Sequence, residues 1–436
     1  MVIGRLAALI VVSNALAACA STGDCAPLES CDIRERSCQE QVAKTVACLR
    51  GSGSVTPRVD VVDADDFIDE QVKAADEEPL SDDLRDHYGA LHLFRLMPAD
   101  VEAGQLAEDE WDDVAAFFDS DTHRVTVLDR GVEMNSAGSV LLLAHELVHA
   151  QQSRETDDEF YPPVDDSRDA SWAANAMVEG EATLYQDVAD VYAYGFAPGD
   201  LDWKRIFVDF ESDSWIYASG ERAIYERVDS SFSYAFGGAY VSAAYRRGGA
   251  AAVRKAVRDV PASTREVSAG YPRRAERFAI ESLDEVAIPM LPETYTYLSS
   301  DRAGAYLFES FLVRAEGRLR ALPDLVGTGV TGDSLSTFRA GEDQVAVFWR
   351  VRFEDEDHAM FIESRLTELQ ASWVVKRDDR DLIVAALSDE ALRDEIAGDL
   401  AWGPAPEPVV DTDTSEMDEP KRARQIRCAF RRLAGQ

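Results

Sequence analysis

The sequence has few basic residues: 44 lysines and arginines stand against 82 aspartates and glutamates, and the formal net charge is -38. Such a charge repels nucleic acid phosphates and anionic lipid headgroups, so we expect neither to bind the folded protein. Beyond the first residues, no apolar run is long enough to cross a bilayer. With 46% hydrophobic and 29% charged residues among 436, the composition predicts a folded protein of two or three domains.

Residues 1–18 differ from the rest of the chain because they carry a single charge, on Arg5. An apolar run over residues 6–12 and a stretch of small residues follow, which is the pattern of an export signal. The segment ends in Leu-Ala-Ala-Cys and resembles the bacterial lipobox, in which the cysteine, here Cys19, is lipidated and becomes the new N-terminus. The alternative is an ordinary signal peptide cut just before it. We expect an exported protein anchored by a lipid on Cys19. The resemblance to Gram-negative lipoproteins implies the outer membrane, because Ala20 and not an aspartate follows the cysteine.

Cysteine is scarce, and four of the six cysteines lie close together after the lipobox, at Cys25, Cys31, Cys38 and Cys48. Export implies an oxidising compartment, so two disulfides are expected, with three possible pairings. A zinc site is the alternative, but no Cys-x-x-Cys pair supports it. Cys428 has no evident partner.

Residues 51–54, Gly-Ser-Gly-Ser, predict a flexible linker by their composition.

The remaining pattern predicts an α+β protein. Helices are expected over residues 65–76, 81–97, 135–153 and 170–194, and a strand over residues 124–129. A further helix is expected to end at Gly248 and Gly249. A strand over 344–353, a helix over 357–369 and a hairpin over 372–387, turning at residues 378–379, predict a smaller α+β unit near the C-terminus.

The chain has only six histidines, yet two stand four apart in His145-Glu-Leu-Val-His149. The helix around them is apolar almost all round and is expected to be buried. Residues four apart share one helical face, so both imidazoles can bind one ion, with Glu146 beside them to deprotonate a water molecule. The alternative is a pair of core histidines held by hydrogen bonds, with an incidental glutamate.

A tetrahedral zinc ion with one open position requires a third protein ligand. Val-Glu-Gly-Glu-Ala at residues 178–182 lies on the next predicted helix, and Glu179 is the expected ligand. Glu181, two residues further on, is the competing candidate. Only one of the two can be the ligand, because residues two apart on a helix cannot both face the ion. A solvated acidic helix face is the alternative explanation of both carboxylates.

The two motifs together resemble the gluzincin class of zinc metallopeptidases, where a His-Glu-x-x-His helix precedes a helix with a Glu ligand. The resemblance implies a mainly helical zincin-like domain with a small sheet. It makes His145, His149 and Glu179 zinc ligands and Glu146 the general base for zinc-activated water that attacks a peptide carbonyl. Gly180 would let the two helices approach closely.

Outside these motifs, residues 80–370 diffusely resemble uncharacterised bacterial metallopeptidase-like envelope proteins. The expected substrate is a polypeptide. Tyr234 and Tyr240 are candidate donors to the oxyanion, and the alternative is that they are half-buried packing residues. The competing hypothesis is a catalytically inactive, peptidase-like binding or scaffolding lipoprotein. The intact general base Glu146 argues against it.

These expectations divide the chain into consecutive regions. They are a lipoprotein signal peptide at 1–18, a cysteine-rich segment and linker at 19–60, a zincin-like metallopeptidase domain at 61–265, a C-terminal helical and α+β region at 266–400, and a disordered acidic linker with a short basic tail at 401–436.

Overall fold

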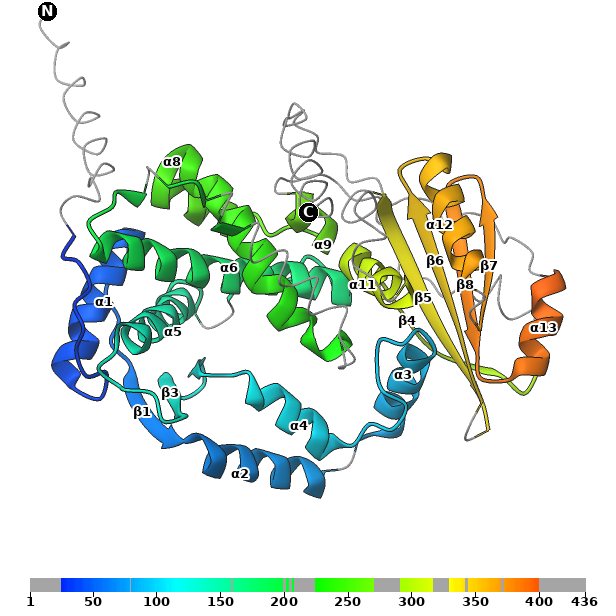
Figure 1. Ribbon diagram of the computed structural model, residues 1–436, viewed down its shortest axis with the longest axis horizontal. Helices are drawn as coiled ribbons and strands as arrows, with labels where there is room; N and C mark the ends of the chain where they lie inside the picture. The colour runs from blue at the N-terminus through cyan, green and yellow to red at the C-terminus, as the bar shows by residue number, and fades with distance from the viewer. Residues whose placement is uncertain are drawn as a thin grey trace, which may run out of the picture.

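The computed structural model describes residues 25–78, 80–157, 160–198, 201–203, 206–207, 224–269, 291–316, 329–341, 344–369 and 372–399. The predicted signal segment with Cys19, and the predicted acidic linker and basic tail with Cys428, lie outside these residues. Within them the fold is α+β, as predicted, with a helical part and two separate sheets (Figure 1). Among the described helices, none combines the length and the apolar composition needed to cross a bilayer.

The N-terminal half contains α1 (Arg36–Arg50), β1 (Arg58–Asp63), α2 (Ala64–Glu77), α3 (Asp82–Leu93), α4 (Ala103–Asp112), β2 (Ala116–Asp119), β3 (Arg124–Asp129), α5 (Ala137–Glu155) and α6 (Arg168–Ala193). The C-terminal half contains η3 (Tyr225–Arg227), the π-helix η4 (Asp229–Gly237), α8 (Gly238–Arg258), α9 (Thr264–Ala269), β4 (Thr296–Asp301), α11 (Gly304–Glu316), β5 (Val330–Ala340), β6 (Gln344–Phe353), α12 (Glu356–Glu368), β7 (Trp373–Asp378), β8 (Asp381–Leu387) and α13 (Glu390–Asp399).

Helices α5 and α6 form the centre of the helical part (Figure 1). Each begins at a serine that accepts a hydrogen bond from a backbone N–H three residues on: Ser136 for α5 and Ser167 for α6. Both predicted helices are confirmed. Helix α6 packs against α1, α5, η4 and α8, which explains why most of its residues are buried although five of them are acidic.

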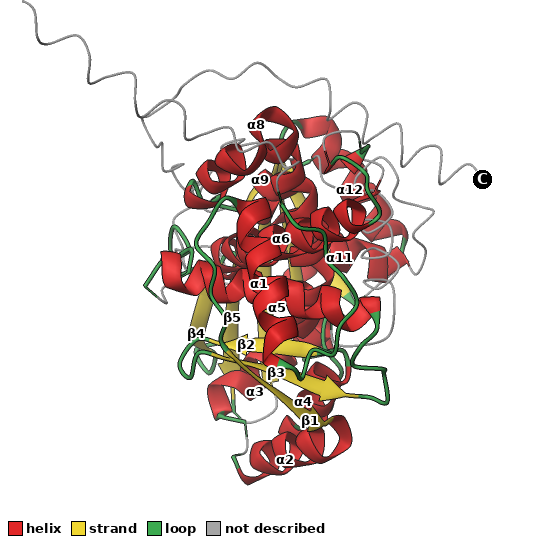
Figure 2. Cartoon of the chain, turned by 90° about the vertical axis from the view of Figure 1, so that its left-hand side faces the viewer, coloured by secondary structure: helices red, strands yellow, loops and turns green. Residues whose placement is uncertain are grey.

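A three-stranded sheet with the order β1-β3-β2 lies against α5 through β2 (Figure 2). Strand β1 pairs parallel with β3, and β2 pairs antiparallel with β3. The predicted strand at 124–129 is confirmed as β3. Strand β1 was not predicted, because its aspartates Asp60 and Asp63 interrupt the apolar pattern. Strand β2 has no partner on its other edge among the described residues.

The cysteine-rich segment is docked onto the helical part. The expectation of two disulfides is confirmed, with the pairs Cys25–Cys48 and Cys31–Cys38. Helix α1 packs against α5 and α6, and the boundary expected between residues 60 and 61 falls inside β1.

Residues 51–54, predicted as a flexible linker, form hydrogen bonds with polar side chains of α5. Ser52 donates its hydroxyl to Gln151 Oε1 at 2.6 Å, and Arg154 donates to the Gly53 and Ser54 carbonyls. Composition alone cannot reveal such partners, because they lie about a hundred residues further along the chain.

The second sheet is antiparallel, has the order β4-β5-β6-β8-β7, and lies at one end of the molecule (Figure 1). The two faces of this sheet contribute to different cores, as β6 shows. Val347, Trp349 and Val351 on one face belong to the main core, with α3, α11 and α12. Ala346 and Phe348 on the other face belong to a smaller core, with α13. The predicted strand, helix and hairpin are confirmed. The hairpin loop is Asp379–Arg380, one residue later than predicted, with Asp379 at a φ of 52°.

Two buried carboxylates join this sheet to the start of α6. Asp169 accepts hydrogen bonds from the backbone N–H and the hydroxyl of Thr264, and Asp333 accepts from the Gly304 N–H and from Trp349 Nε1. Burial, reinforced by the nearby Asp333 charge, raises the pKa of Asp169 to about 7. The boundary expected between residues 265 and 266 falls inside α9, which packs on α6.

The helix after Gly238 does not end where it was expected. The pair Gly248 and Gly249 forms a kink with non-helical dihedral angles, and α8 then continues to Arg258. Gly249 has a φ of 59°, a conformation that favours glycine, so the glycines bend the helix instead of ending it.

The substitution of both Cys25 and Cys48 by Ser should lower the free energy of unfolding by about 2–4 kcal/mol, because the disulfide closes a loop of 23 residues. The matched pair Cys31→Ser and Cys38→Ser removes a loop of 7 residues and should cost less. Urea denaturation of the two double variants and of the wild type measures both effects. Equal costs would contradict a loop-length origin.

Candidate metal centre

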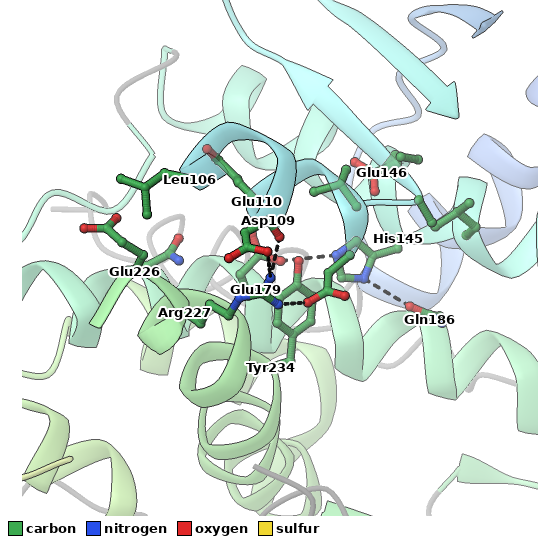
Figure 3. A pocket seen from close by; sticks show the side chains of 16 residues that line it. Leu106, Asp109, Glu110, His145, Glu146, Glu179, Gln186, Glu226, Arg227 and Tyr234 are labelled. Atoms are coloured by element: carbon green, nitrogen blue, oxygen red, sulfur yellow. Dashed lines mark hydrogen bonds and ion pairs between the residues drawn. The ribbon is translucent and has the colours of Figure 1, made fainter. Parts of the chain in front are cut away.

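Three potential metal ligands from α5 and α6, His145, His149 and Glu179, meet at one point. Figure 3 shows His145 and Glu179 in the wall of a cavity. His145 Nε2 lies 3.1 Å from His149 Nε2 and 3.2 Å from Glu179 Oε2, and His149 Nε2 lies 3.4 Å from the same oxygen. Both imidazoles are buried, and Glu179 is nearly so. The structure therefore brings together the three residues that the sequence suggested as ligands.

The spacing of these donor atoms fits a tetrahedral zinc ion. Zinc bonds of about 2.0–2.1 Å to nitrogen or oxygen place neighbouring ligand atoms about 3.3–3.4 Å apart, close to the separations found here. Two imidazole nitrogens and a carboxylate this close repel one another unless a cation, either a proton or a metal ion, lies among them.

Without a metal ion, a proton takes this role. Burial disfavours the charged imidazolium of His149, but the Glu179 carboxylate outweighs this effect and raises the pKa of His149 to about 9. Burial likewise opposes the charge on Glu179, but the charge of His149 and hydrogen bonds from both histidines hold its pKa well below the usual range. A cation is thus stabilised at the centre of the three ligands.

Two glutamines orient the imidazoles. His149 Nδ1 lies 2.8 Å from Gln152 Oε1, and His145 Nδ1 lies 3.1 Å from Gln186 Oε1. A ring that donates from Nδ1 leaves the Nε2 lone pair free to bind a metal ion. We did not predict either glutamine. The available signal was spacing: Gln152 lies one helical turn after His149, and Gln186 lies two turns after Glu179.

Glu181 points away from the centre and is fully buried among other partners. Its Oε1 accepts from Arg50 at 2.8 Å, and its Oε2 accepts from Gln152 Nε2 at 3.0 Å and from the Tyr161 hydroxyl at 2.9 Å. With both oxygens engaged, Glu181 is not placed to bind the same ion. Of the two competing carboxylates, only Glu179 lies within coordination reach of the histidines.

Gly180 allows a close helix approach, but to a different helix from the one expected. A Cβ atom at Gly180 would lie 2.3 Å from the backbone of Gly237 in η4, and one at Gly237 would lie 2.0 Å from the Ala176 carbonyl oxygen. Neither contact tolerates a side chain. The close contact therefore joins α6 to η4, not α6 to α5.

Glu146 lies beside the three ligands and is 3% exposed. Its carboxylate accepts a hydrogen bond from the backbone N–H of Phe118 on β2. Burial raises the pKa of Glu146, and the two neighbouring histidines only partly offset this effect. Glu146 therefore holds a proton more readily than an exposed glutamate does, which suits a group that accepts and returns a proton.

Of the two tyrosines suggested by the sequence, only Tyr234 reaches the centre. Its ring stacks on that of His145, with centroids 5.7 Å apart and planes inclined by 18°, and it is 39% exposed. Tyr240 is buried in α8 and lines neither cavity at the centre. Burial, and the nearby charge of Glu266, raise its pKa. The expectation of a site role for Tyr240 therefore has no support in the geometry.

Two cavities meet at the centre and share Ala116, Glu146, Asn175, Glu179 and Tyr234 in their walls. One, of about 640 Å³, is also lined by acidic residues of α4 and its surroundings and by Arg227, which pairs with Asp113. The other, of about 400 Å³, is mainly aromatic and apolar, with Phe117, Phe118, Phe160, Tyr161, Pro163 and Val178 in its wall. The centre is thus accessible from two sides with different chemistry.

No protein-family model, no curated protein and no solved structure matches this chain. The resemblance to gluzincins therefore stays a prediction that rests on the two motifs and on the geometry described above.

Zinc binding at pH 7 should release about one proton per ion, because His149, with its pKa of about 9, is protonated before the metal binds. The release should decline as the pH rises through 9. Calorimetric titration with zinc in buffers of different ionisation enthalpy counts the protons. Binding without proton release at pH 7 would show that His149 is already neutral there.

Proposed function

We propose that this protein is a gluzincin-like zinc metallopeptidase that hydrolyses peptide bonds. The observation that carries the proposal is the meeting of His145, His149 and Glu179 at tetrahedral ligand spacing, with Glu146 beside them, where two cavities join. A purely structural zinc site usually has four protein ligands and no adjacent base. Three ligands, an open side and a buried carboxylate favour catalysis.

A zinc ion held by these three residues would supply a Lewis acid that polarises the peptide carbonyl and activates water. Glu146 accepts the proton of the attacking water on its carboxylate and transfers it to the leaving nitrogen as the C–N bond breaks. Tyr234, stacked on His145 at the edge of both cavities, is the candidate donor to the developing oxyanion.

The free edge of β2 offers a place for the substrate backbone. The Ala115 carbonyl bonds to Leu128 of β3, so the backbone groups of alternate residues point toward β3, and those of Ala116 and Phe118 point to the other edge. The Phe118 N–H bonds to Glu146 on that edge. An extended peptide that pairs with this edge would pass directly by the general base.

We also propose that the protein acts at the cell envelope, held by a lipid on Cys19, on exported or extracellular polypeptides. The motif at Cys19 and the disulfides Cys25–Cys48 and Cys31–Cys38 support an oxidising compartment. The competing proposal, an inactive binding or scaffolding lipoprotein, predicts peptide binding without cleavage.

The variant Glu146→Gln should lose cleavage by at least about 100-fold while it still binds one zinc ion per chain, because the substitution removes the base and leaves all three ligands. Cleavage of a mixed peptide library, followed by mass spectrometry, and metal analysis by plasma mass spectrometry measure the two properties. The matched control is Glu133→Gln, which changes an exposed glutamate just before α5.

Unchanged cleavage by Glu146→Gln would refute the mechanism. Zinc binding by the wild type, without chelator-sensitive cleavage of any peptide in the library, would favour the inactive binding protein.

The substrates should carry basic side chains near the cleaved bond, because Asp109, Glu110, Asp113 and Glu226 line the larger cavity and outnumber the one arginine in its described wall, Arg227. Among matched peptides, those with lysine should be cleaved faster than those with glutamate at the same position. The preference should shrink in Glu226→Gln.

The control for this test is Glu108→Gln, an exposed glutamate of α4 that does not line the cavity. An equal loss of preference in Glu108→Gln would point to the overall charge of the protein instead of the cavity wall.

A further inference from the structure

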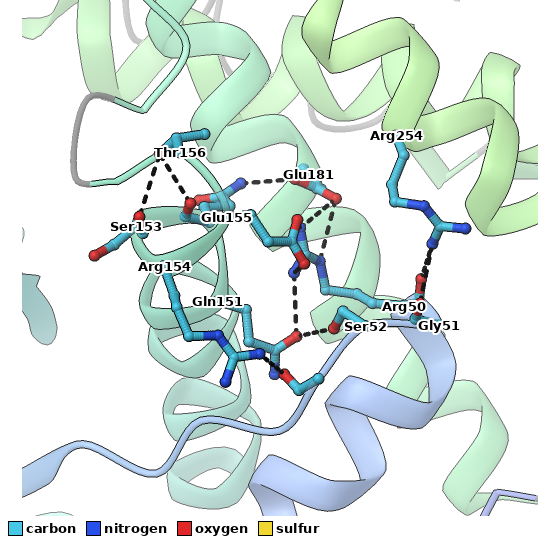
Figure 4. A network of polar contacts seen from close by, with 12 residues as sticks. Arg50, Gly51, Ser52, Gln151, Ser153, Arg154, Glu155, Thr156, Glu181 and Arg254 are labelled. Carbon is cyan, nitrogen blue, oxygen red and sulfur yellow. Dashed lines mark hydrogen bonds and ion pairs between the residues drawn. The ribbon is translucent and has the colours of Figure 1, made fainter.

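A buried polar network joins α1 to α5 and α6 (Figure 4). Arg50 is 1% exposed and Glu181 is fully buried, and they form an ion pair of 2.8 Å. Arg50 also donates to Gln151 Oε1 at 3.1 Å and to Glu155. Charges this deeply buried are costly unless they are paired and hydrogen-bonded, so this network holds its members in defined positions.

The network reaches the metal ligands through one side chain, Gln152. Its amide nitrogen donates to Glu181 Oε2 at 3.0 Å and to the Val178 carbonyl at 3.0 Å. Because both partners are acceptors, the amide must present its nitrogen to them and its oxygen to His149. His149 must then donate from Nδ1, which leaves its Nε2 lone pair aimed at the metal centre.

Arg50 is itself held by its place in the chain. It is the last residue of α1, two residues after the disulfide-bonded Cys48, and Gly51 ends the helix with a φ of 64°. Arg254 of α8 donates to the Arg50 carbonyl from the other side. The guanidinium of Arg50 therefore stays opposite Glu181 only while α1 is docked on the helical part.

We propose that Arg50, Glu181 and Gln152 are positioning residues that fix His149 in the tautomer able to bind metal, so that metal affinity depends on the docking of α1. This inference rests on the proposed zinc site. It extends that site to a distant part of the chain, because Arg50 and Glu181 have a sequence separation of 131.

The alternative is that the network only stabilises the packing of the helices and does not position His149. The test must separate these two roles. A purely structural network affects only the free energy of unfolding, whereas a positioning network also determines which nitrogen of His149 carries the proton. The second property is visible in the metal-free protein, by ¹⁵N NMR of selectively labelled histidine at a pH high enough that the imidazole signals no longer change with pH.

The first variant is Gln152→Leu, which removes the amide that orients His149. The second is the pair Arg50→Met and Glu181→Leu, which replaces the ion pair by apolar side chains and leaves no unpaired buried charge. In both, the His149 signals should move from the Nδ1–H tautomer toward a mixture, and zinc affinity, measured by chelator competition, should fall about 10–100-fold.

Two further variants serve as controls. Arg50→Met with Glu181→Gln keeps an acceptor oxygen for Gln152 and should restore the tautomer and most of the zinc affinity. Arg154→Met removes an arginine of α5 that holds the same segment after α1 but has no contact with Glu181. It should change neither property.

The proposal is overturned if folded Gln152→Leu keeps the wild-type tautomer and zinc affinity, or if Arg154→Met changes them as much as the double variant does. Should the double variant fail to fold, as judged by circular dichroism, Gln152→Leu decides alone. A wild-type protein that binds no zinc would refute the proposed function, whereas the tautomer measurement would still test the positioning role.

Discussion

The fold depends on one constraint: the contact between α5 and α6 buries titratable groups that water can no longer solvate. His145, His149 and Glu179 satisfy one another on one side, and Glu181 is satisfied by Arg50, Tyr161 and Gln152 on the other. Helix α1 must dock to bring Arg50 to Glu181, and η4 must pack at Gly180 to close the other face of α6. Helices α1 and η4 are thus needed to satisfy and enclose the polar groups that the contact between α5 and α6 buries.

The ligands of the candidate site could be predicted from the sequence because they lie in two short motifs, each within one helix. Helical periodicity places His145 and His149 on one face, and geometry forbids Glu179 and Glu181 to share a ligand role. What sequence reasoning could not supply was the choice between the two glutamates on physical grounds. That choice depends on Arg50, which is remote in the chain and reaches Glu181 only in the folded protein. The orienting glutamines were missed because an amide on a helix has many possible partners.

The fold was predictable where apolar periodicity was clear, as in β6 and in α5. It was not predictable where buried strands carry polar residues. Strand β5 buries Asp333, Ser334 and Ser336, whose partners come from other elements, so its sequence lacks the signature of a core strand. The docking of residues 51–54 was missed for the same reason. In each case a distant hydrogen-bond partner, absent from the local pattern, makes burial possible.

Among the residues that the structure describes, no strand pairs with the outer edge of β2, and such an open edge is a risk to a protein. An unpaired strand edge can pair with any extended chain, including the same edge of a second copy. Proline or a bulge would protect the edge, but either would also remove the backbone groups beside Glu146. This strand is only four residues long, and the chain carries a net charge of -38, so that copies repel one another. The acidity of the protein therefore protects against self-association while the edge stays open.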